Sequence, residues 1–323
     1  MNISSINGIE TKNIQRINKI YTSQIKSVCG AEISMKPFKT LWSVGAGQSI
    51  TLPLVNGYSY NCTVDWGDGT SSYINSYDSA NRIHTYSNVG EYVVSIKGIC
   101  EGWNFQTVST SRLLITKVLN FGEVEFKNLS FYNCNNLNEI RGQINGPSIT
   151  DFSNCFYANQ LTSISANLFD NCTQVKDFSS CFRNNQLTSI PAGLFDNCTL
   201  ATNFSSCFYN NSLTSIPENL FDNNTLAVSF SSCFTNNINL KLNKYIFYSE
   251  GQQSTRFLNQ SVNFQNCFYR ISYISPDAEN GEAPDLWNCD FGTGTPTKTG
   301  CFGGNGNNAI TLTNYTSIPS EWK

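Results

Sequence analysis

A Cys-Phe pair recurs at regular intervals through the second half of the chain, and this regularity limits the fold more than any other feature. The cysteines of the pairs are Cys155, Cys181, Cys207, Cys233, Cys267 and Cys301. Consecutive pairs are 26 residues apart three times and then 34 residues apart twice. A period in the twenties is typical of repeat proteins, in which each unit buries its apolar side chains only by stacking on its neighbours.

The apolar residues that keep their place in each unit predict the columns of the buried core. Four sets of equivalent positions are expected to stack: Phe178, Phe204 and Phe230; Leu161, Leu187 and Leu213; Ile164, Ile190 and Ile216; and Phe169, Phe195 and Phe221. We expect short strands at the Leu-x-x-Ile segments, because equivalent extended segments of stacked units can pair. The eight additional residues in each of the last two units are expected to form loops or caps.

The units resemble the BspA-type leucine-rich repeats of bacterial surface proteins, in particular the variant with a Phe-x-x-Cys-Phe element before a Leu-Thr-Ser strand. The residues that carry the resemblance are Phe-Ser-Ser-Cys-Phe at 178–182 and Leu-Thr-Ser-Ile at 187–190. The resemblance implies a leucine-rich-repeat solenoid with a C-terminal cap over residues 110–323. The 26-residue unit is slightly longer than the commoner form, which is the main departure from the family pattern.

Residues 37–109 contain alternating apolar and polar runs separated by turn residues, which indicates short β-strands. Three motifs follow in order: Trp-Gly-Asp-Gly-Thr at 66–70, His-Thr-Tyr at 84–86 and Gly-Glu-Tyr at 90–92. Together they resemble the polycystic-kidney-disease-type (PKD) immunoglobulin-like domain. The resemblance implies a β-sandwich in which Trp66 packs in the core, the Asp-Gly pairs form a tight turn and His84 has a structural role.

Asp65 and Asp68 lie in this turn, and their carboxylates raise the question of a calcium site. Calcium takes about six to eight oxygen ligands. Two carboxylates without the remaining ligands are a weak signal, so we favour a turn-forming role for both and keep calcium binding as the alternative.

An Ile-rich pattern with an eleven-residue period fills residues 1–36. Its isoleucines are Ile3, Ile6, Ile9, Ile14, Ile17, Ile20 and Ile25. An eleven-residue period can specify a right-handed coiled coil, whereas the content of Ser, Asn and Gly disfavours a helix and fits a strand-and-turn thread. The strip is too short to bury itself, so we expect an anchor and oligomerisation segment. Packing on the next domain is the alternative.

Thirteen cysteines would ordinarily indicate disulfides, but most of them occupy repeat positions, and Cys172 and Cys198 share a second column. Equivalent residues of stacked strands lie about 4.8 Å apart with parallel side chains. A disulfide fits this arrangement poorly because its Cβ atoms lie about 3.8 Å apart. We therefore expect buried free thiols.

His84 is the only histidine, and the sequence contains no nucleophile elbow, phosphate-binding loop or dinucleotide fingerprint. Carboxylates are sparse, since only 13% of residues are charged. We therefore expect no enzymatic activity, no cofactor and no metal. A net charge of −3 and a pI near 5.3 also give no basis for binding nucleic acid or an anionic membrane.

One position varies while the frame around it stays constant, namely the residue directly after each Cys-Phe pair. It holds Tyr157, Arg183, Tyr209, Thr235 and Tyr269. Tyr and Arg are enriched in binding hot spots, so we predict ligand binding at Tyr157, Arg183, Tyr209 and Tyr269 if the position is exposed. Packing of this stripe against a neighbouring domain or subunit is an equal alternative.

A constant row of asparagines accompanies the variable position. It consists of Asn159, Asn185, Asn211 and Asn237. A side-chain amide supplies both donors and an acceptor, so we expect these residues to hydrogen-bond the backbone at each turn and not to contact a ligand.

Together these expectations predict a function for the protein. The N-terminal sequence shows no signal-peptide pattern, and no run of about 18 apolar residues is present, which indicates folding in a cytosol without membrane insertion. The Ile-x-x-Ile-Asn-Gly start resembles the starts of tailed-phage structural proteins. We therefore expect a phage virion surface protein (a head or tail fibre, or a capsid decoration) that is held by other virion proteins and binds a host protein or glycan. The alternatives are a bacterial cell-surface adhesin and a structural virion component without a ligand.

Overall fold

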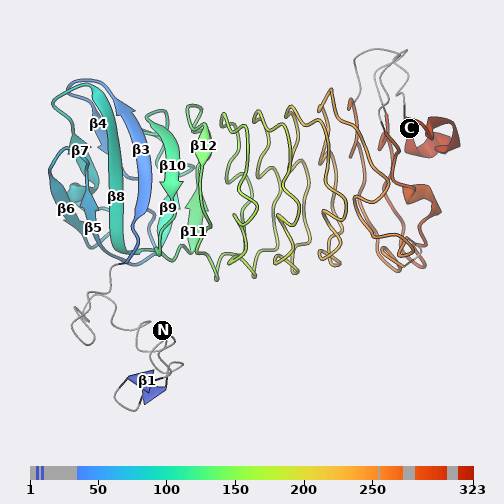
Figure 1. Ribbon diagram of the computed structural model, residues 1–323, viewed down its shortest axis with the longest axis horizontal. Helices are drawn as coiled ribbons and strands as arrows, with labels where there is room; N and C mark the ends of the chain where they lie inside the picture. The colour runs from blue at the N-terminus through green and yellow to red at the C-terminus, as the bar shows by residue number, and fades with distance from the viewer. Residues whose placement is uncertain (1–4, 7–8, 11–34, 254, 272–280, 304–311) are drawn as a thin grey trace.

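The computed structural model describes residues 5–6, 9–10, 35–253, 255–271, 281–303 and 312–323. Within these ranges the chain is mainly β, as expected, and its helical pieces are single 3₁₀ turns. None of the described helices is long and apolar enough to cross a membrane. Figure 1 shows an elongated body with a β-sheet at one end and a row of stacked chain turns that runs from this sheet toward the C-terminus.

A six-stranded mixed sheet forms one end of the body. Its strand order is β12-β10-β3-β8-β5-β6. The strands are β3 (Phe38–Val44), β5 (Tyr60–Asp65), β6 (Ser71–Ile74), β8 (Gly90–Cys100), β10 (Ile115–Asn120) and β12 (Glu139–Ile140). All neighbours are antiparallel except β10 and β12, which are parallel. The long strand β8 therefore lies inside the sheet, between β3 and β5 (Figure 1).

Short elements complete the secondary structure. β1 (Ser5–Ile6) pairs with β2 (Ile9–Glu10), β4 (Ser49–Thr51) pairs with β7 (Ile83–Thr85), and β9 (Gly102–Asn104) pairs with β11 (Asn128–Ser130). The first two pairs are antiparallel and the third is parallel. The 3₁₀ turns are η1 (Ala80–Arg82), η2 (Leu286–Asn288), η3 (Tyr315–Ser317) and η4 (Ser320–Trp322).

One face of the six-stranded sheet is buried, because its strands alternate apolar and polar side chains. In β3 the side chains of Phe38, Thr40, Trp42 and Val44 are buried, and those between them are not, as the two-residue period of a strand requires. The buried face packs against Trp103, whose ring centroid lies 5.0 Å from that of Phe38 and 6.4 Å from that of Trp42. Aromatic rings thus dominate this end of the core.

The tight turn at residues 66–70 places Trp66 in the core. The Trp66 side chain is fully buried, and its ring stacks on His84 with centroids 4.7 Å apart. Gly67 has φ +83°, and a Cβ atom there would lie 2.7 Å from the carbonyl oxygen of Val93. Only glycine satisfies both conditions. The expected burial of Trp66 and the expected turn are confirmed.

The sheet continues across the expected boundary between residues 109 and 110. β10 and β12 lie C-terminal to this boundary, yet both extend the sheet that begins with β3. The buried apolar side chains likewise form one cluster from Phe38 to Trp322. The division into folding units at residues 37–109 and 110–323 stays a prediction.

The chain turns after β12 are joined by isolated parallel bridges, and five of these form one continuous row of equivalent positions. The five bridges join Asp151 to Asp177, Asp177 to Asn203, Asn203 to Ser229, Ser229 to Asn263 and Asn263 to Thr297. Their spacing follows the period of the Cys-Phe pairs. The turns are therefore stacked in register, as Figure 1 shows.

The first Leu-x-x-Ile segment, residues 137–140, contains the strand β12, but the following segments form no regular strands in the described turns, so the expectation is wrong for them. Neighbouring segments are joined by isolated hydrogen bonds, such as Gln186 N–H to Leu161 O (2.9 Å) and Ser212 N–H to Leu187 O (3.0 Å). In two units a proline, Pro191 or Pro217, follows the isoleucine. Proline has no N–H to continue a ladder, so the pairing stops after a few residues.

The expected apolar columns are confirmed as buried stacks. All four sets of equivalent Phe, Leu and Ile side chains are buried. Phe178, Phe204 and Phe230 stack at centroid distances of 5.5 and 5.8 Å. A fifth column consists of the phenylalanines of the Cys-Phe pairs, Phe156, Phe182, Phe208, Phe234, Phe268 and Phe302. Its centroids are 5.4–5.8 Å apart and its ring planes lie within 9° of each other.

The constant asparagines bind the backbone, as expected. Asn185 Nδ2 donates to the carbonyl oxygens of Phe156 (2.7 Å) and Phe182 (3.1 Å). Its Oδ1 accepts from Leu161 N–H at 3.1 Å. Asn211 and Asn237 make the equivalent bonds in the next two turns. Each of these asparagines therefore ties its own turn to the preceding one.

Candidate binding surface

Three of the four side chains predicted to bind a ligand are neighbours on the stacked turns. Tyr157, Arg183 and Tyr209 occupy equivalent positions of consecutive turns, and each is half-buried. The Cζ atom of Arg183 lies 4.2 Å from the ring centroid of Tyr209 and 6.0 Å from that of Tyr157. The arginine thus lies between two tyrosine rings, at distances typical of cation–π contacts.

Tyr132 extends this row by one turn. Its ring stacks on that of Tyr157, with centroids 5.1 Å apart. The sequence pattern missed Tyr132 because its unit lacks a Cys-Phe pair. The signal that could have found it is the preceding Phe131, whose ring stacks on Phe156 at 5.7 Å. We call the row of Tyr132, Tyr157, Arg183 and Tyr209 the tyrosine–arginine stripe.

Thr235 ends the stripe. Its side chain is buried, and its Oγ1 donates to the carbonyl oxygen of Asn266 at 2.5 Å. Tyr269, the fourth predicted ligand-binding residue, is half-buried and lies in the turn beyond Thr235. The structure therefore brings together three of the predicted residues and separates Tyr269 from them by a buried threonine.

The guanidinium of Arg183 carries an uncompensated charge. Its Nε is buried without a hydrogen-bond partner. The side chain also forms no ion pair and no hydrogen bond with any residue in the part of the chain that the structure describes. The contacts that hold this cation are those with the two tyrosine rings.

A row of side-chain amides adjoins the stripe in sequence, since the amides directly follow Arg183, Tyr209 and Thr235. Asn184 Nδ2 donates to the hydroxyl oxygen of Tyr157 at 3.3 Å. Asn210 Nδ2 donates to Asn184 Oδ1 at 3.1 Å, and Asn236 donates in turn to Asn210. We call Asn184, Asn210 and Asn236 the amide ladder. Together with the stripe it forms a polar surface on which Arg183 is the charged member.

Exposed large hydrophobic side chains occur on both sides of the stripe in sequence, and Ile238 (38% exposed) lies two residues after Asn236. The large hydrophobic residues with the most exposure include Val89 (75%), Leu113 (51%), Leu226 (49%) and Leu258 (43%). None of the exposed large hydrophobic side chains belongs to residues 114–225, a fully described range that contains the whole stripe. The half-buried tyrosines are therefore the large aromatic side chains that the stripe itself presents.

The two aspartates of the tight turn have turn-forming bonds. Asp65 Oδ1 accepts from Gly67 N–H at 2.9 Å. Asp68 Oδ1 accepts from the N–H (3.0 Å) and the hydroxyl (2.6 Å) of Thr70, and its Oδ2 lies 2.7 Å from His84 Nε2. Burial acts to raise the pKa of Asp68, but the bonds to Thr70 and His84 outweigh it and lower the pKa to about 2. The favoured turn role accounts for these oxygens.

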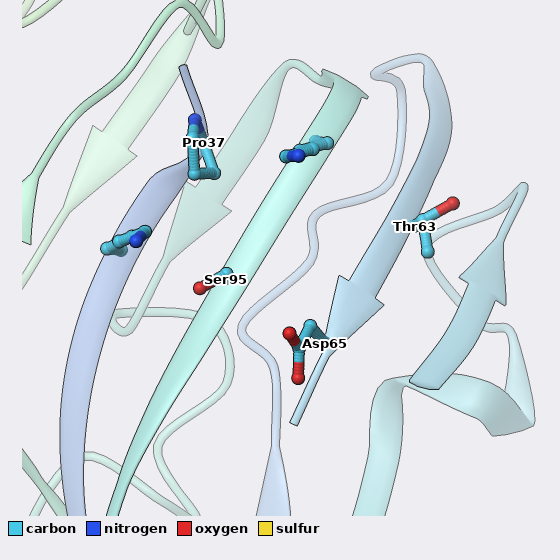
Figure 2. Close-up of a pocket in the computed structure, with 6 residues that line it drawn as sticks. Pro37, Thr63, Asp65 and Ser95 are labelled. Atoms are coloured by element: carbon cyan, nitrogen blue, oxygen red, sulfur yellow. The ribbon is translucent and has the colours of Figure 1, made fainter. Parts of the chain in front are cut away.

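A hollow of about 400 Å³ opens on the outer face of the sheet (Figure 2). It is lined by Pro37, Lys39, Thr63, Asp65, Ser95 and Lys97. Pro37 directly precedes β3, and the other five residues lie on β3, β5 and β8. These strands are distant in sequence, so no local pattern pointed to the hollow. Lys39 pairs in register with Ser95, and Ser95 with Asp65. The hollow combines two cations with one carboxylate, so its charge does not single out one class of ligand.

The cysteines provide no reactive site in the described part of the chain. The twelve described there are all free and buried, which confirms the expected thiol columns. Burial raises the pKa of Cys181 and Cys207 well above the ordinary value, and only a thiolate is an effective nucleophile or metal ligand. Among the described residues no group of three or more His, Cys, Asp or Glu side chains could hold a metal ion.

The predicted anchor lies mostly outside the described residues. This applies to Ile3, Ile14, Ile17, Ile20 and Ile25. Ile6 in β1 and Ile9 in β2 are register partners in the antiparallel pair formed by these strands. The anchor function of the segment stays a prediction.

No protein-family model matches the sequence, and no curated protein is significantly similar to it.

Proposed function

We propose that this protein is a non-enzymatic surface protein of a phage virion, either a head or tail fibre or a capsid decoration, and that its tyrosine–arginine stripe binds a host protein or glycan. The observation that carries the proposal is the unpaired guanidinium of Arg183 between the rings of Tyr157 and Tyr209. Tyrosine and arginine are the residue types that dominate binding hot spots. A half-exposed cation held by two rings contributes to recognition once a partner supplies the missing anion.

The proposed architecture is an N-terminal assembly thread, an immunoglobulin-like sandwich of PKD type and a leucine-rich-repeat solenoid of BspA type. The bridges between equivalent positions of consecutive units and the parallel phenylalanine columns support the solenoid. The buried Trp66 and the turn that follows it support the PKD-type domain. A solenoid suits a binding protein because stacked turns present one extended surface.

In this proposal residues 1–36 attach the protein to other virion structural proteins, and the protein assembles as a homo-oligomer. Host cytoplasm is the place of synthesis and the virion surface is the final location. The support is the Ile-rich pattern with its eleven-residue period, which cannot bury its apolar side chains within one chain.

The experiment that tests the binding function replaces Tyr157, Arg183 and Tyr209 together with alanine in the full-length protein and measures adsorption of particles to host cells. We expect adsorption to fall at least about ten-fold, since a single hot-spot residue is worth about 2 kcal/mol or more. A matched control replaces Tyr73, Tyr77 and Arg270, which are exposed and lie outside the stripe.

Immunogold labelling of the same particles supplies the second readout. Particles that carry the triple variant and still adsorb like the wild type would favour a structural virion component without a ligand. Labelling of bacterial cell surfaces and not of particles would favour a bacterial adhesin.

A further inference from the structure

The guanidinium of Arg183 is held in place before any ligand binds. Its Cζ lies 4.2 Å from the Tyr209 ring centroid, and Tyr157 covers it at 6.0 Å on the neighbouring turn. A free surface arginine loses rotamer entropy when it binds a partner, whereas a side chain already stacked between two rings loses less. A ligand would also not have to displace a protein carboxylate from this cation, because no described residue forms an ion pair or hydrogen bond with it.

From this geometry we infer that the ligand of the tyrosine–arginine stripe is a carboxylate-bearing saccharide. The inference rests on the proposed binding function and names its ligand class. A guanidinium presents parallel N–H donors that match the two oxygens of a carboxylate. Nε of Arg183 is buried, so the terminal nitrogens are the donors that such a group reaches.

The neighbouring hydroxyls and amides supply further polar partners. The hydroxyl oxygen of Tyr157 accepts a hydrogen bond from Asn184, so its own O–H is left to donate to a ligand. Asn184 and Asn210 continue the polar surface along the amide ladder. An amide offers both a donor and an acceptor, which is the combination that sugar hydroxyls use.

The surroundings favour a saccharide over a protein partner. Protein interfaces have a core of buried apolar and aromatic side chains, but no large hydrophobic side chain is exposed anywhere in residues 114–225. The faces of the Tyr132 and Tyr157 rings are stacked on each other, and Tyr209 is stacked on Arg183. The Tyr157 ring therefore lies between Tyr132 and Arg183 and offers its edge and hydroxyl, which favours polar, charge-assisted recognition at this position.

The test measures binding of the full-length protein to pairs of saccharides that differ only in the carboxylate. The pairs are polygalacturonate and its methyl ester, hyaluronan and carboxyl-reduced hyaluronan, and sialylated and desialylated mucin. We expect the wild type to prefer the acidic member of at least one pair, with an affinity that falls as salt is raised. The variant Arg183→Gln should lose about ten- to hundred-fold in affinity for that member, as expected for a lost hydrogen bond between charged groups.

Two further variants separate recognition from folding and from unspecific charge. Arg183→Lys keeps the positive charge but lacks the planar pair of N–H donors that a guanidinium presents to a carboxylate. Its affinity should therefore lie between that of the wild type and that of Arg183→Gln. The matched control Arg270→Gln removes an exposed arginine that directly follows Tyr269, outside the stripe, and it should bind like the wild type. Urea unfolding of each variant verifies that the fold is retained.

Three results would overturn the inference. These are the absence of an acid preference in every pair, an acid preference that survives Arg183→Gln, and equal Arg183-dependent binding of poly-glutamate, which would identify a protein carboxylate as the ligand. A different result would refute the proposed binding function itself, namely adsorption of the triple alanine variant to host cells at the level of the wild type. Reduced adsorption by that variant without an acid preference would leave the function standing and refute the ligand class.

Discussion

In the five turns that contain Cys155, Cys181, Cys207, Cys233 and Cys267, the residue before this cysteine and the third residue after it lie in the left-handed region of the backbone, and neither is glycine. In one turn they are Ser180 (φ 54°) and Asn184 (φ 58°), and in the next they are Ser206 (φ 55°) and Asn210 (φ 54°). Asparagine enters this region more readily than most residues, because its short polar side chain hydrogen-bonds locally. It also forms the amide ladder, which glycine could not. This is one physical reason for the abundance of asparagine in the sequence.

The constant asparagines allow a direct test of their role. Replacing Asn185 with alanine leaves the carbonyl oxygen of Phe156 and the N–H of Leu161 buried without a partner, whereas the carbonyl oxygen of Phe182 keeps its bond from Asn211. We expect the free energy of unfolding to fall by at least about 2 kcal/mol, since each buried unsatisfied group costs about 1–3 kcal/mol. Urea unfolding measures the change. Ser189→Ala, at an exposed position of the same turn, is the control and should stay within about 0.5 kcal/mol.

Asp68 makes the stability depend on pH in the acid range. Its pKa is lowered from 3.8 to about 2 by bonds to Thr70 and His84 that outweigh the effect of burial. A group whose pKa is lowered by folding contributes stability above its unfolded pKa and loses that contribution as the pH falls through the folded value. The unfolding free energy of Asp68→Asn should therefore fall less steeply than that of the wild type between about pH 4 and pH 2. Equal slopes in urea titrations at several pH values would contradict the assignment.

The repeat turn is an element that has no core of its own. Phe182 stacks between Phe156 and Phe208, which belong to the turns on either side. Cys181 and Cys207 fill the adjacent column as small buried apolar groups. Because every contact of this kind joins two turns, the stability of one turn depends on its neighbours.

Truncation of one ring should therefore destabilise more than one turn. We expect Phe182→Ala to lower the unfolding free energy by about 3–5 kcal/mol, which is the usual cost of removing a buried phenylalanine. Leu226→Ala, at a side chain that is 49% exposed, should change it by less than about 1 kcal/mol. Chemical denaturation of the two variants makes the comparison, and similar losses for both would refute the column as a source of stability.

Both ends of the stacked turns are covered within the whole molecule. At the C-terminal end, Phe302 N–H donates to the carbonyl oxygen of Trp322 at 2.9 Å, and the Trp322 ring lies 5.9 Å from that of Phe264. At the other end, β12 and β10 join the first turns to the six-stranded sheet (Figure 1). Such terminal covers are needed because an uncapped repeat exposes its apolar face.

A pair of fragments tests this continuity. Residues 110–323 contain β10 and β12 without β3, the neighbour of β10, whereas residues 35–323 contain the complete sheet. We expect the shorter fragment to aggregate, or to unfold at a clearly lower urea concentration than the longer one, because its first turns expose a row of apolar side chains. A monomeric fragment 110–323 with an unchanged midpoint would establish an independent unit that begins at residue 110.

Part of the candidate site could be predicted from the sequence because the repeat is regular. The Cys-Phe frame aligned Tyr157, Arg183 and Tyr209, and the structure stacks them in that order. The frame could not show that Thr235 is buried with its hydroxyl bonded to the carbonyl oxygen of Asn266. It also missed Tyr132, whose unit lacks the Cys-Phe pair.

The sequence by itself determined the mainly β character, the period of the stacked turns and the residues of their columns. It could do so because a repeat places each residue against its equivalent one period away, so the contact partner is read from the spacing. Only the tertiary structure decided the order of the six strands, the passage of the sheet across residues 109 and 110, and the hollow between β3, β5 and β8. These features depend on pairing between segments far apart in the chain, and no local pattern encodes such pairing.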